Sequence, residues 1–177
     1  MTDRIYNVLF LCTGNSARSI LAEALLNRMG EGRFRAWSAG SFPKGEVHPE
    51  ALRLLSRLGF DTTDLASKSW DAFAEPDAPE FHFIFTVCDD AAGETCPIWP
   101  GHPMAAHWGI EDPARAVPGD QPEAFQLAFN YLRRRISLFL ALPIESLDRM
   151  TMRRRLVDIG ARSEGGSAVA AAATDEF

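Results

Sequence analysis

The sequence predicts an α/β fold, a three-layer sandwich in which helices flank a four-stranded parallel sheet. Residues 5–11 and 82–87 are apolar runs typical of buried strands, and residues 35–40 and 104–108 are candidates for two further strands. Amphipathic segments lie between most of them, and such strand–helix–strand units close into parallel sheets. With 177 residues, 46% hydrophobic and 24% charged, the chain is large enough for one sizeable core.

The N-terminal half alternates strand and helix. The strand at residues 5–11 enters a polar loop, after which apolar side chains at 21, 24, 25 and 29 predict a helix over residues 20–29. Gly30 ends this helix, and residues 35–40 form the second strand. His48 and Pro49 open a helix that closes at Gly59.

The C-terminal half begins with a short helix at residues 67–73 and a strand at 82–87. Residues 89–103 are irregular, and segments of this length are usually functional or mobile. A strand at 104–108, a long core-packing helix at 122–142 and a shorter basic helix at 147–159 follow. We divide the chain into a domain at 1–142 and a helical extension with a flexible tail at 143–177.

Composition limits the functions open to the chain. The formal net charge is -6, whereas a protein that binds nucleic acid through its phosphates needs a basic face. Neither a signal peptide nor a membrane span fits the apolar runs. Three unevenly spaced cysteines do not make a disulfide framework. We therefore expect a cytoplasmic protein with working thiols, and neither nucleic acid nor membrane as a partner.

The stretch from Cys12 to Ser19 joins the first strand to the first helix. A loop that enters a helix N-terminus points backbone N–H groups inward and attracts a tetrahedral oxyanion. Arg18 adds a planar fork of donors for two oxygens of such an anion. The same field favours a nucleophilic thiolate at Cys12, and the hydroxyls of Ser16 and Ser19 are suited to steady its sulfur. The alternative is a buried core cysteine. The predicted oxyanion-binding loop consists of Thr13, Gly14, Asn15, Ser16, Ala17 and Arg18.

Two further thiols, Cys88 and Cys96, follow the third predicted strand. Ligands bind beyond the carboxyl ends of strands in parallel sheets, and Cys12 and Cys88 both fall at such ends. Reducing an oxyanion through a thiol adduct requires a second thiol to break the adduct, and a third can pass the disulfide to an external reductant. Alternatively, both thiols are inert or bind zinc, although zinc sites have closer spacing and further ligands.

These motifs resemble a known family. The stretch from Cys12 to Ser19 resembles the signature of low-molecular-weight protein tyrosine phosphatases and of the arsenate reductases built on the same fold. Residues 87–97 resemble the redox loop of three-cysteine arsenate reductases, and residues 107–113 resemble their acid loop. The resemblance covers about residues 5–142 and implies an arsenate reductase with a phosphatase-like fold.

The resemblance also implies a reaction sequence. Cys12 attacks arsenate, Arg18 and the loop amides hold its oxygens, and Asp112 donates a proton to the departing oxygen. Cys88 then attacks Cys12 and releases arsenite, and Cys96 takes over the bond to give a Cys88–Cys96 disulfide. The implied electron donor is thioredoxin, or glutathione with glutaredoxin, and phosphate or sulfate would mimic arsenate. No cofactor is required.

Alternatives remain open for the acid. Asp112 stands before Pro113, and Asp-Pro pairs commonly begin turns. Glu111 is the rival acid. His107, beside a tryptophan at the end of an apolar run, is more typical of a packed side chain than of a catalytic one.

Alternatives also remain for the activity. A tyrosine phosphatase that does not use Cys88 or Cys96 is the second hypothesis, although Ala114 stands where such phosphatases usually place an aromatic residue. Many of them also carry a cysteine where this chain has Ala17. The third hypothesis is a thiol-based oxyanion sensor without turnover.

Some members of the resembled family hold a potassium ion behind the oxyanion loop. The matching oxygen-bearing residues here are Asn15, Glu23, Ser38 and Asp71. Lys68 lies close to Asp71 in the sequence, and its ammonium group in the same place would make the ion unnecessary.

Overall fold

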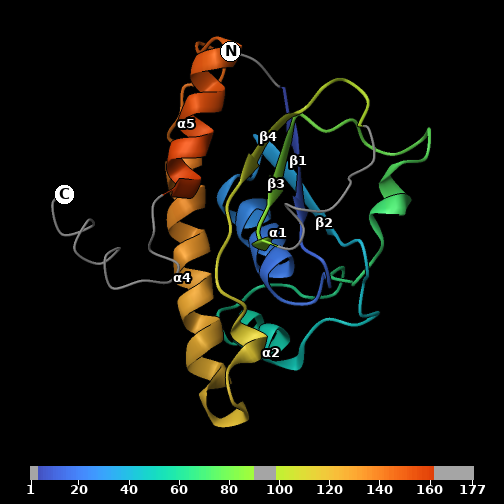
Figure 1. Ribbon diagram of the computed structural model, residues 1–177, viewed down its shortest axis with the longest axis vertical. Coiled ribbons are helices and arrows are strands. Elements are labelled where there is room, and N and C mark those ends of the chain that lie inside the picture. Colours follow the sequence, from blue (N-terminus) through green and yellow to red (C-terminus); the bar gives the residue numbers. More distant parts are fainter. Residues whose placement is uncertain (1–3, 90–98, 162–177) are drawn as a thin grey trace, which may run out of the picture.

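The structure is a computed structural model that describes residues 4–89 and 99–161. Its sheet has four parallel strands in the order β2-β1-β3-β4, namely β1 Tyr6–Leu11, β2 Phe34–Ala39, β3 Phe83–Thr86 and β4 Met104–His107 (Figure 1). In register, Phe10 of β1 lies between Ser38 of β2 and Phe85 of β3. The predicted parallel sheet is confirmed, with strand ends within one residue of those expected.

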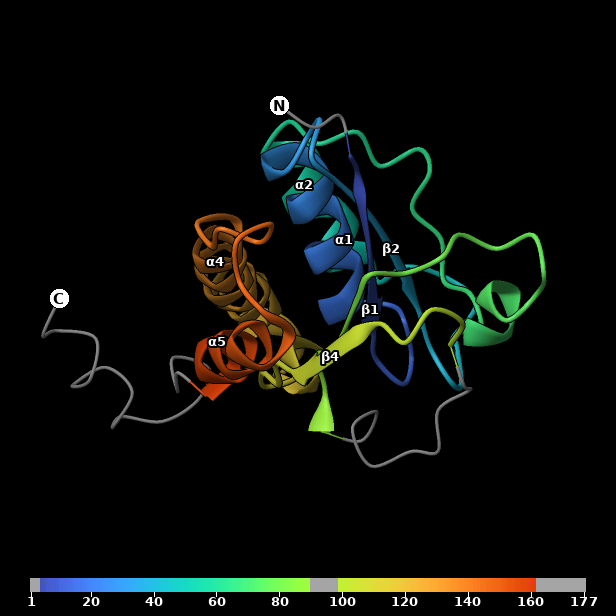
Figure 2. The same cartoon turned by 90° about the horizontal axis from the view of Figure 1, so that it is seen from above.

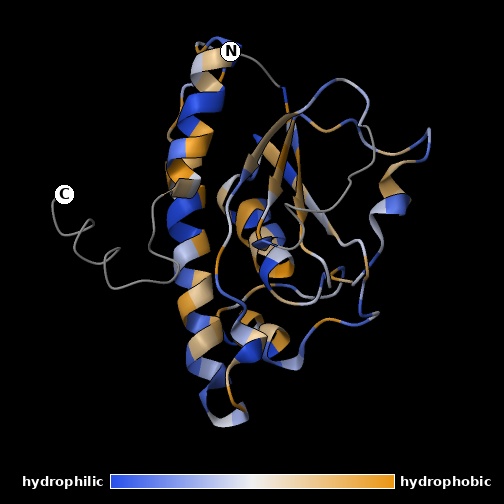
Figure 3. Cartoon of the chain, in the orientation of Figure 1, coloured by the Kyte–Doolittle hydropathy of each residue, from blue (hydrophilic) through white to orange (hydrophobic). Residues whose placement is uncertain are grey.

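One face of the sheet carries the main core. It is covered by the helices α1 Arg18–Met29, α2 Pro49–Arg57, α4 Gln121–Leu140 and α5 Arg149–Ala161 (Figures 1 and 2). Val8 and Phe10 of β1 point to this face, where they share the core with Phe139 of α4. Hydrophobic and hydrophilic residues alternate along α4 and α5 (Figure 3), as expected for helices with one buried face.

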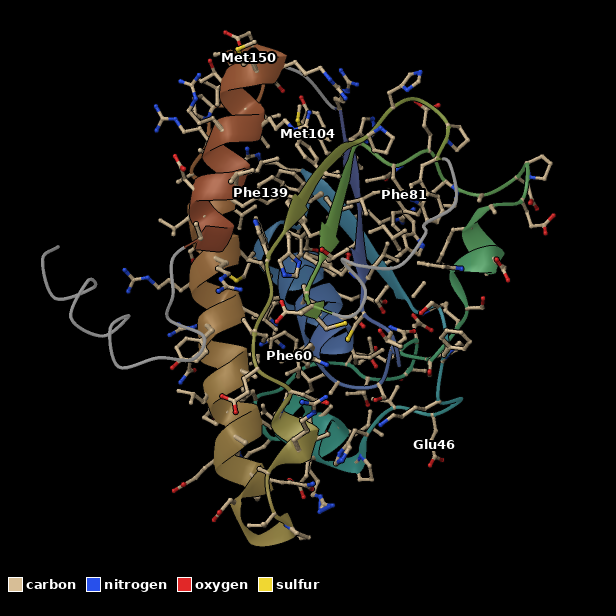
Figure 4. All side chains as sticks on the ribbon, in the orientation of Figure 1. Glu46, Phe60, Phe81, Met104, Phe139 and Met150 are labelled. Atoms are coloured by element: carbon tan, nitrogen blue, oxygen red, sulfur yellow. The ribbon has the colours of Figure 1, made fainter. Side chains whose placement is uncertain are left out.

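The opposite face of the sheet is covered by a thinner layer. Because side chains alternate along a strand, Leu9 and Leu11 point here and pack with Phe81 and Trp99. The 3-10 helix η1, Trp70–Phe73, adds its own aromatic side chains to this cluster. Figure 4 shows Phe139 and Phe81 on opposite sides of the strands.

The helix predicted at residues 67–73 is wrong in its first half. Only η1 is helical, because Ser69, just before it, pairs with Gly40 in an isolated parallel bridge. The N–H of Gly40 donates to the Lys68 carbonyl, and the N–H of Trp70 donates to the Gly40 carbonyl, both at 2.9 Å. Backbone bonds to another part of the chain therefore replace those that a helix would make.

Helix α5 belongs to the main core. It begins at Arg149 because the carboxylate of Asp148 accepts a hydrogen bond from the N–H of Thr151 at 2.8 Å, as an N-cap does. Its residues Met152, Leu156 and Ile159 are buried in the cluster that contains Phe139. The division of the chain at residue 142 stays a prediction. Within residues 4–89 and 99–161, no helix is long and apolar enough to cross a lipid bilayer.

Two predictions concern residues outside those described. Cys96 and most of the segment predicted to be irregular belong to residues 90–98, and the predicted flexible tail belongs to residues 162–177. Both predictions remain untested.

Candidate active site

The segment at residues 41–48 fixes the backbone of the oxyanion loop through hydrogen bonds. Three loop carbonyls accept hydrogen bonds from N–H groups of this segment: Thr13 from Phe42 at 3.0 Å, Gly14 from Lys44 at 3.0 Å and Ser16 from His48 at 2.9 Å. A trans peptide points its carbonyl and the following N–H in opposite directions. The N–H groups of Gly14, Asn15 and Ala17 therefore point to the inner side of the loop. Such an array of inward N–H groups suits an anion before any ligand arrives.

Gly40 permits this close approach. A Cβ atom at this position would lie 2.4 Å from the Thr13 oxygen and 2.5 Å from the Cys12 oxygen. No other residue fits without moving the loop, so the glycine at the end of β2 fixes how close segment 41–48 comes to Cys12.

Asn15 ties the loop to the protein interior. It is fully buried, with a left-handed φ of 44°, a conformation that asparagine tolerates better than most residues. Its amide nitrogen donates to the hydroxyls of Ser19 at 2.8 Å and Ser38 at 3.0 Å. Its amide oxygen accepts from the N–H of Lys68 at 2.8 Å. One side chain thus connects the loop, α1, β2 and the segment before η1.

Replacing Asn15 by alanine is expected to lower the free energy of unfolding by about 3 kcal/mol, from lost buried hydrogen bonds and a strained φ. Chemical denaturation measures this change. Asn130→Ala, at an exposed position on α4, is the matched control and should change stability by less than about 0.5 kcal/mol. Equal stabilities of the two variants would contradict the role assigned to Asn15.

Ser19, predicted to steady the Cys12 sulfur, is fully buried, and its hydroxyl accepts the Asn15 amide. Ser16 is also buried. The Ser19 hydroxyl therefore bonds to Asn15 of the oxyanion loop. That Ser16 or Ser19 stabilises the Cys12 thiolate stays a prediction.

Arg18 connects the oxyanion loop with the predicted acid. It is the first residue of α1, and one guanidinium nitrogen donates to the Ile110 carbonyl at 2.9 Å. The other terminal nitrogen lies 3.6 Å from Oδ2 of Asp112. The Asp112 Oδ1 atom accepts from the N–H of Ala114, so Asp112 also caps the short 3-10 helix η2, Pro113–Arg115. The acid and turn interpretations of Asp112 are therefore compatible, because each uses a different oxygen.

Cys12 and Cys88 lie against each other. Cys12 follows β1 and Cys88 follows the neighbouring strand β3, and both are buried, at 5% and 2% exposure. The Cys88 sulfur accepts from the N–H of Thr13 at 3.3 Å and lies 3.6 Å from the Thr13 hydroxyl. The two thiols also share a hydrogen bond. The second thiol is therefore within reach of the first.

The surroundings of Cys12 do not favour its thiolate. The hydrogen bond with Cys88 and burial raise the pKa of Cys12 above its ordinary value, against the opposing effect of the Arg18 guanidinium. The negative charge of the Asp112 carboxylate adds a smaller rise in this pKa. The expected thiolate at Cys12 is not favoured in this state, because the hydrogen bond with Cys88 and burial outweigh the attraction of Arg18.

We expect Cys88→Ala to speed the alkylation of Cys12 by iodoacetamide at neutral pH. The hydrogen bond with Cys88 raises the pKa of Cys12, so its removal should lower that pKa. Each unit by which the pKa falls enlarges the Cys12 thiolate fraction at neutral pH about tenfold. Peptide mass spectrometry over a pH series measures the Cys12 reaction separately from that of Cys96. The midpoint of the profile should move to lower pH, and an unchanged midpoint would contradict the assigned coupling.

The structure gathers three of the four predicted potassium ligands around a lysine instead. The buried Glu23 accepts from the Ser38 hydroxyl at 2.5 Å, and Ser38 also contacts Asn15. The Lys68 ammonium donates to the carbonyls of Ser38 at 3.0 Å and Ala66 at 2.8 Å. Burial raises the pKa of Glu23, and the attraction of Lys68 opposes this rise. A potassium ion fits poorly here, because the side-chain oxygens of Asn15, Ser38 and Glu23 already bond to protein groups. The Lys68 ammonium also places a positive charge beside them.

Asp71, the fourth predicted ligand, lies apart from this group. It is exposed at the start of η1, where its N–H donates to the Ser69 hydroxyl. Among the residues that the structure describes, no cluster of three or more His, Cys, Asp or Glu side chains is arranged to hold a metal ion.

His107 is exposed, and the prediction of a packed side chain is wrong. One ring nitrogen lies 2.7 Å from the Thr86 hydroxyl, and the other lies 2.8 Å from the carboxylate of Asp89. The alternation of side chains in β4 turns it outward. His107 thereby contacts the residue directly after Cys88, a pairing that the sequence spacing gives no means to predict.

The chain is similar to a described protein family, to known sequences and to solved structures. Residues 7–152 match the family described as low molecular weight phosphotyrosine protein phosphatase. An arsenate reductase from Shouchella clausii is 36% identical over 109 residues, covering 62% of this chain and 75% of its own. A solved arsenate reductase in its phosphate-binding state is 25% identical with a TM-score of 0.62, covering 77% of this chain and 98% of its own. A thioredoxin-dependent arsenate reductase from Corynebacterium glutamicum is 26% identical with a TM-score of 0.54, covering 78% of this chain and 65% of its own. With a family match over most of its length, the chain belongs to the low molecular weight phosphotyrosine protein phosphatase family.

Proposed function

We propose that this protein is an arsenate reductase that works through Cys12, Cys88 and Cys96. The observation that carries the proposal is the contact of the Cys88 thiol with Cys12 and Thr13. Ester hydrolysis needs one nucleophile, whereas reduction needs a second thiol within reach of the first. The arsenate reductases among the relatives support the same activity.

The first step is attack on arsenate. The anion binds to the inward N–H groups of the loop and to Arg18, which leaves Asp112 to turn toward the substrate. The Cys12 sulfur forms a bond to arsenic, and an arsenic–oxygen bond breaks. Protons from the Cys12 thiol and Asp112 leave with the departing oxygen as water.

The second step transfers two electrons. The Cys88 sulfur attacks the Cys12 sulfur, so that a disulfide forms and the sulfur–arsenic bond breaks. The bonding pair stays on arsenic, which leaves as arsenite, and the Cys88 proton passes to an arsenite oxygen. The Thr13 N–H bond to the Cys88 sulfur favours its thiolate during this attack.

The third step frees the oxyanion loop. Cys96 attacks the Cys88 sulfur and releases Cys12 as a thiol, and the resulting Cys88–Cys96 disulfide is reduced by an external dithiol. The relative from Corynebacterium glutamicum favours thioredoxin as that donor over glutathione with glutaredoxin. Because all three thiols must return to the reduced state, we propose a cytoplasmic location.

Arsenate-dependent oxidation of NADPH tests the proposal, with thioredoxin and its reductase in one assay and glutaredoxin, glutathione and its reductase in the other. We expect turnover with thioredoxin, and its loss in Asp112→Asn but not in Glu111→Gln. Hydrolysis of aryl phosphate without arsenate turnover would favour the phosphatase instead. Binding without turnover of either substrate would favour the oxyanion sensor.

We also propose that the Lys68 ammonium stands in for potassium behind the loop. Its contacts with the Ser38 carbonyl and its attraction to Glu23 support this. Replacing sodium chloride by potassium chloride at constant ionic strength should leave the arsenate KM unchanged. A several-fold fall in KM that is specific to potassium would contradict the substitution.

A further inference from the structure

A buried arginine binds backbone carbonyls of the acid loop, residues 107–113. Arg135 of α4 is 1% exposed, and one guanidinium nitrogen donates to the carbonyls of Trp108 at 2.8 Å and Gly109 at 3.0 Å. The next carbonyl, that of Ile110, accepts from Arg18. Two arginines from two helices therefore bind three consecutive carbonyls of the loop that contains Asp112.

Arg135 stands in a position that packing would give to an apolar residue. It lies three residues after Leu132 and four before Phe139, both fully buried on the same face of α4. Burying a guanidinium is costly unless hydrogen bonds compensate. The carbonyls of the acid loop are among the acceptors that compensate the buried guanidinium. The loop backbone therefore stabilises the Arg135 charge, and Arg135 in turn fixes the loop backbone.

Helix α5 holds the same loop at Trp108. The Trp108 side chain is fully buried, with its ring 3.8 Å from that of Phe85, and its indole N–H donates to the Leu156 carbonyl at 2.9 Å. Gly160 lets the helix approach, because a Cβ there would lie 2.2 Å from the His107 oxygen. The family match ends at residue 152, so Leu156 and Gly160 lie beyond the matched region.

We propose that Arg135, Trp108 and α5 form a brace that positions the Asp112 carboxyl for proton transfer. The inference rests on the acid role proposed above for Asp112. The front of the loop is attached to the strand ends, where Trp108 N–H donates to Thr86 and Ile110 N–H donates to Val87. The brace attaches the other side of the loop to α4 and α5. In this arrangement α5 supports the proton donor, and Arg135 and Trp108 are positioning residues.

Arg135→Lys tests the arginine. Lysine keeps the charge but is shorter and lacks the guanidinium nitrogen that donates to both carbonyls. In single turnovers of the fully reduced protein without external donor, we expect arsenite to form about tenfold more slowly, with the half-saturating arsenate concentration unchanged and the alkaline limb of the pH profile weakened. Arg133→Lys, exposed on the same helix, is the matched control and should behave like the wild type.

Gly160→Ala tests the helix, and it also keeps the inference testable should Arg135→Lys fail to fold. The added methyl group should push α5 from the loop, slow arsenite formation and increase hydrogen exchange in residues 108–113. Gly119→Ala is the matched control, because a Cβ there meets nothing within 4 Å. Wild-type rates and exchange in Gly160→Ala, or a wild-type rate and pH profile in a folded Arg135→Lys, would overturn the brace.

Asp112→Asn separates this inference from the proposed function. If Asp112→Asn retains the wild-type rate, the acid role fails and the brace fails with it. If Asp112→Asn loses the alkaline limb while Arg135→Lys and Gly160→Ala keep it, the brace alone fails.

Discussion

Cys88→Ala is expected to lower sustained arsenate reduction by more than about 1000-fold, the scale on which removing one member of a covalent catalytic unit acts. Among the residues that the structure describes, Cys88 is the thiol placed to break the sulfur–arsenic bond, and this variant lacks it. Phosphate binding should remain, because the loop amides and Arg18 are unchanged. Arsenate-dependent NADPH oxidation measures the loss, and isothermal titration with phosphate measures the retained site.

Cys96→Ala provides the matched comparison. It lacks the third thiol only, so it should release one arsenite per protein and then stop, whereas Cys88→Ala should release none. Sustained arsenate reduction by Cys88→Ala would contradict the relay, and hydrolysis of an aryl phosphate by the same variant would not.

Arg18→Lys is expected to lower kcat/KM for arsenate about 100- to 1000-fold, as the loss of an oxyanion-binding group does. A lysine retains the charge but loses the fork that can hold two oxygens of one anion. It also loses the hydrogen bond to Ile110 and the approach to Asp112, so the oxyanion and the acid are both less well placed.

Arg53→Lys is the control for this change, because Arg53 is an exposed arginine on α2 that pairs with Glu50. It should leave kcat/KM within about twofold of the wild type. Phosphate affinity, measured by titration, should fall in Arg18→Lys only. Equal phosphate affinity in the two variants would contradict the assignment of Arg18 to the oxyanion.

The sheet and the nucleophile loop could be predicted from the sequence because each depends on neighbouring residues. The run at 5–11 alternates its side chains between two buried faces, which an apolar strand signals directly. The loop from Cys12 to Ser19 carries its geometry in residues that are adjacent along the chain. Asp112 was found through its motif, and the structure brings it near Arg18.

What the sequence did not reveal depends on contacts between distant segments. The pKa of Cys12 is raised by Cys88, 76 positions later, and only the pairing of β1 with β3 brings the two together. Segment 41–48 holds the loop through backbone atoms, which side-chain patterns do not report. For Arg135 the sequence offers one indication, a charged residue on the apolar face of the long helix. A charge in such a place is rarely buried unless it is paired with other groups.

One turnover of the fully reduced protein with arsenate and no external donor, followed by disulfide mapping by mass spectrometry, shows whether the two electrons leave through the thiols. The three-thiol relay should give one arsenite per protein, a disulfide between Cys88 and Cys96, and a free thiol at Cys12. Arsenite formation with Cys88 still reduced, or no arsenite and three free thiols, would contradict it.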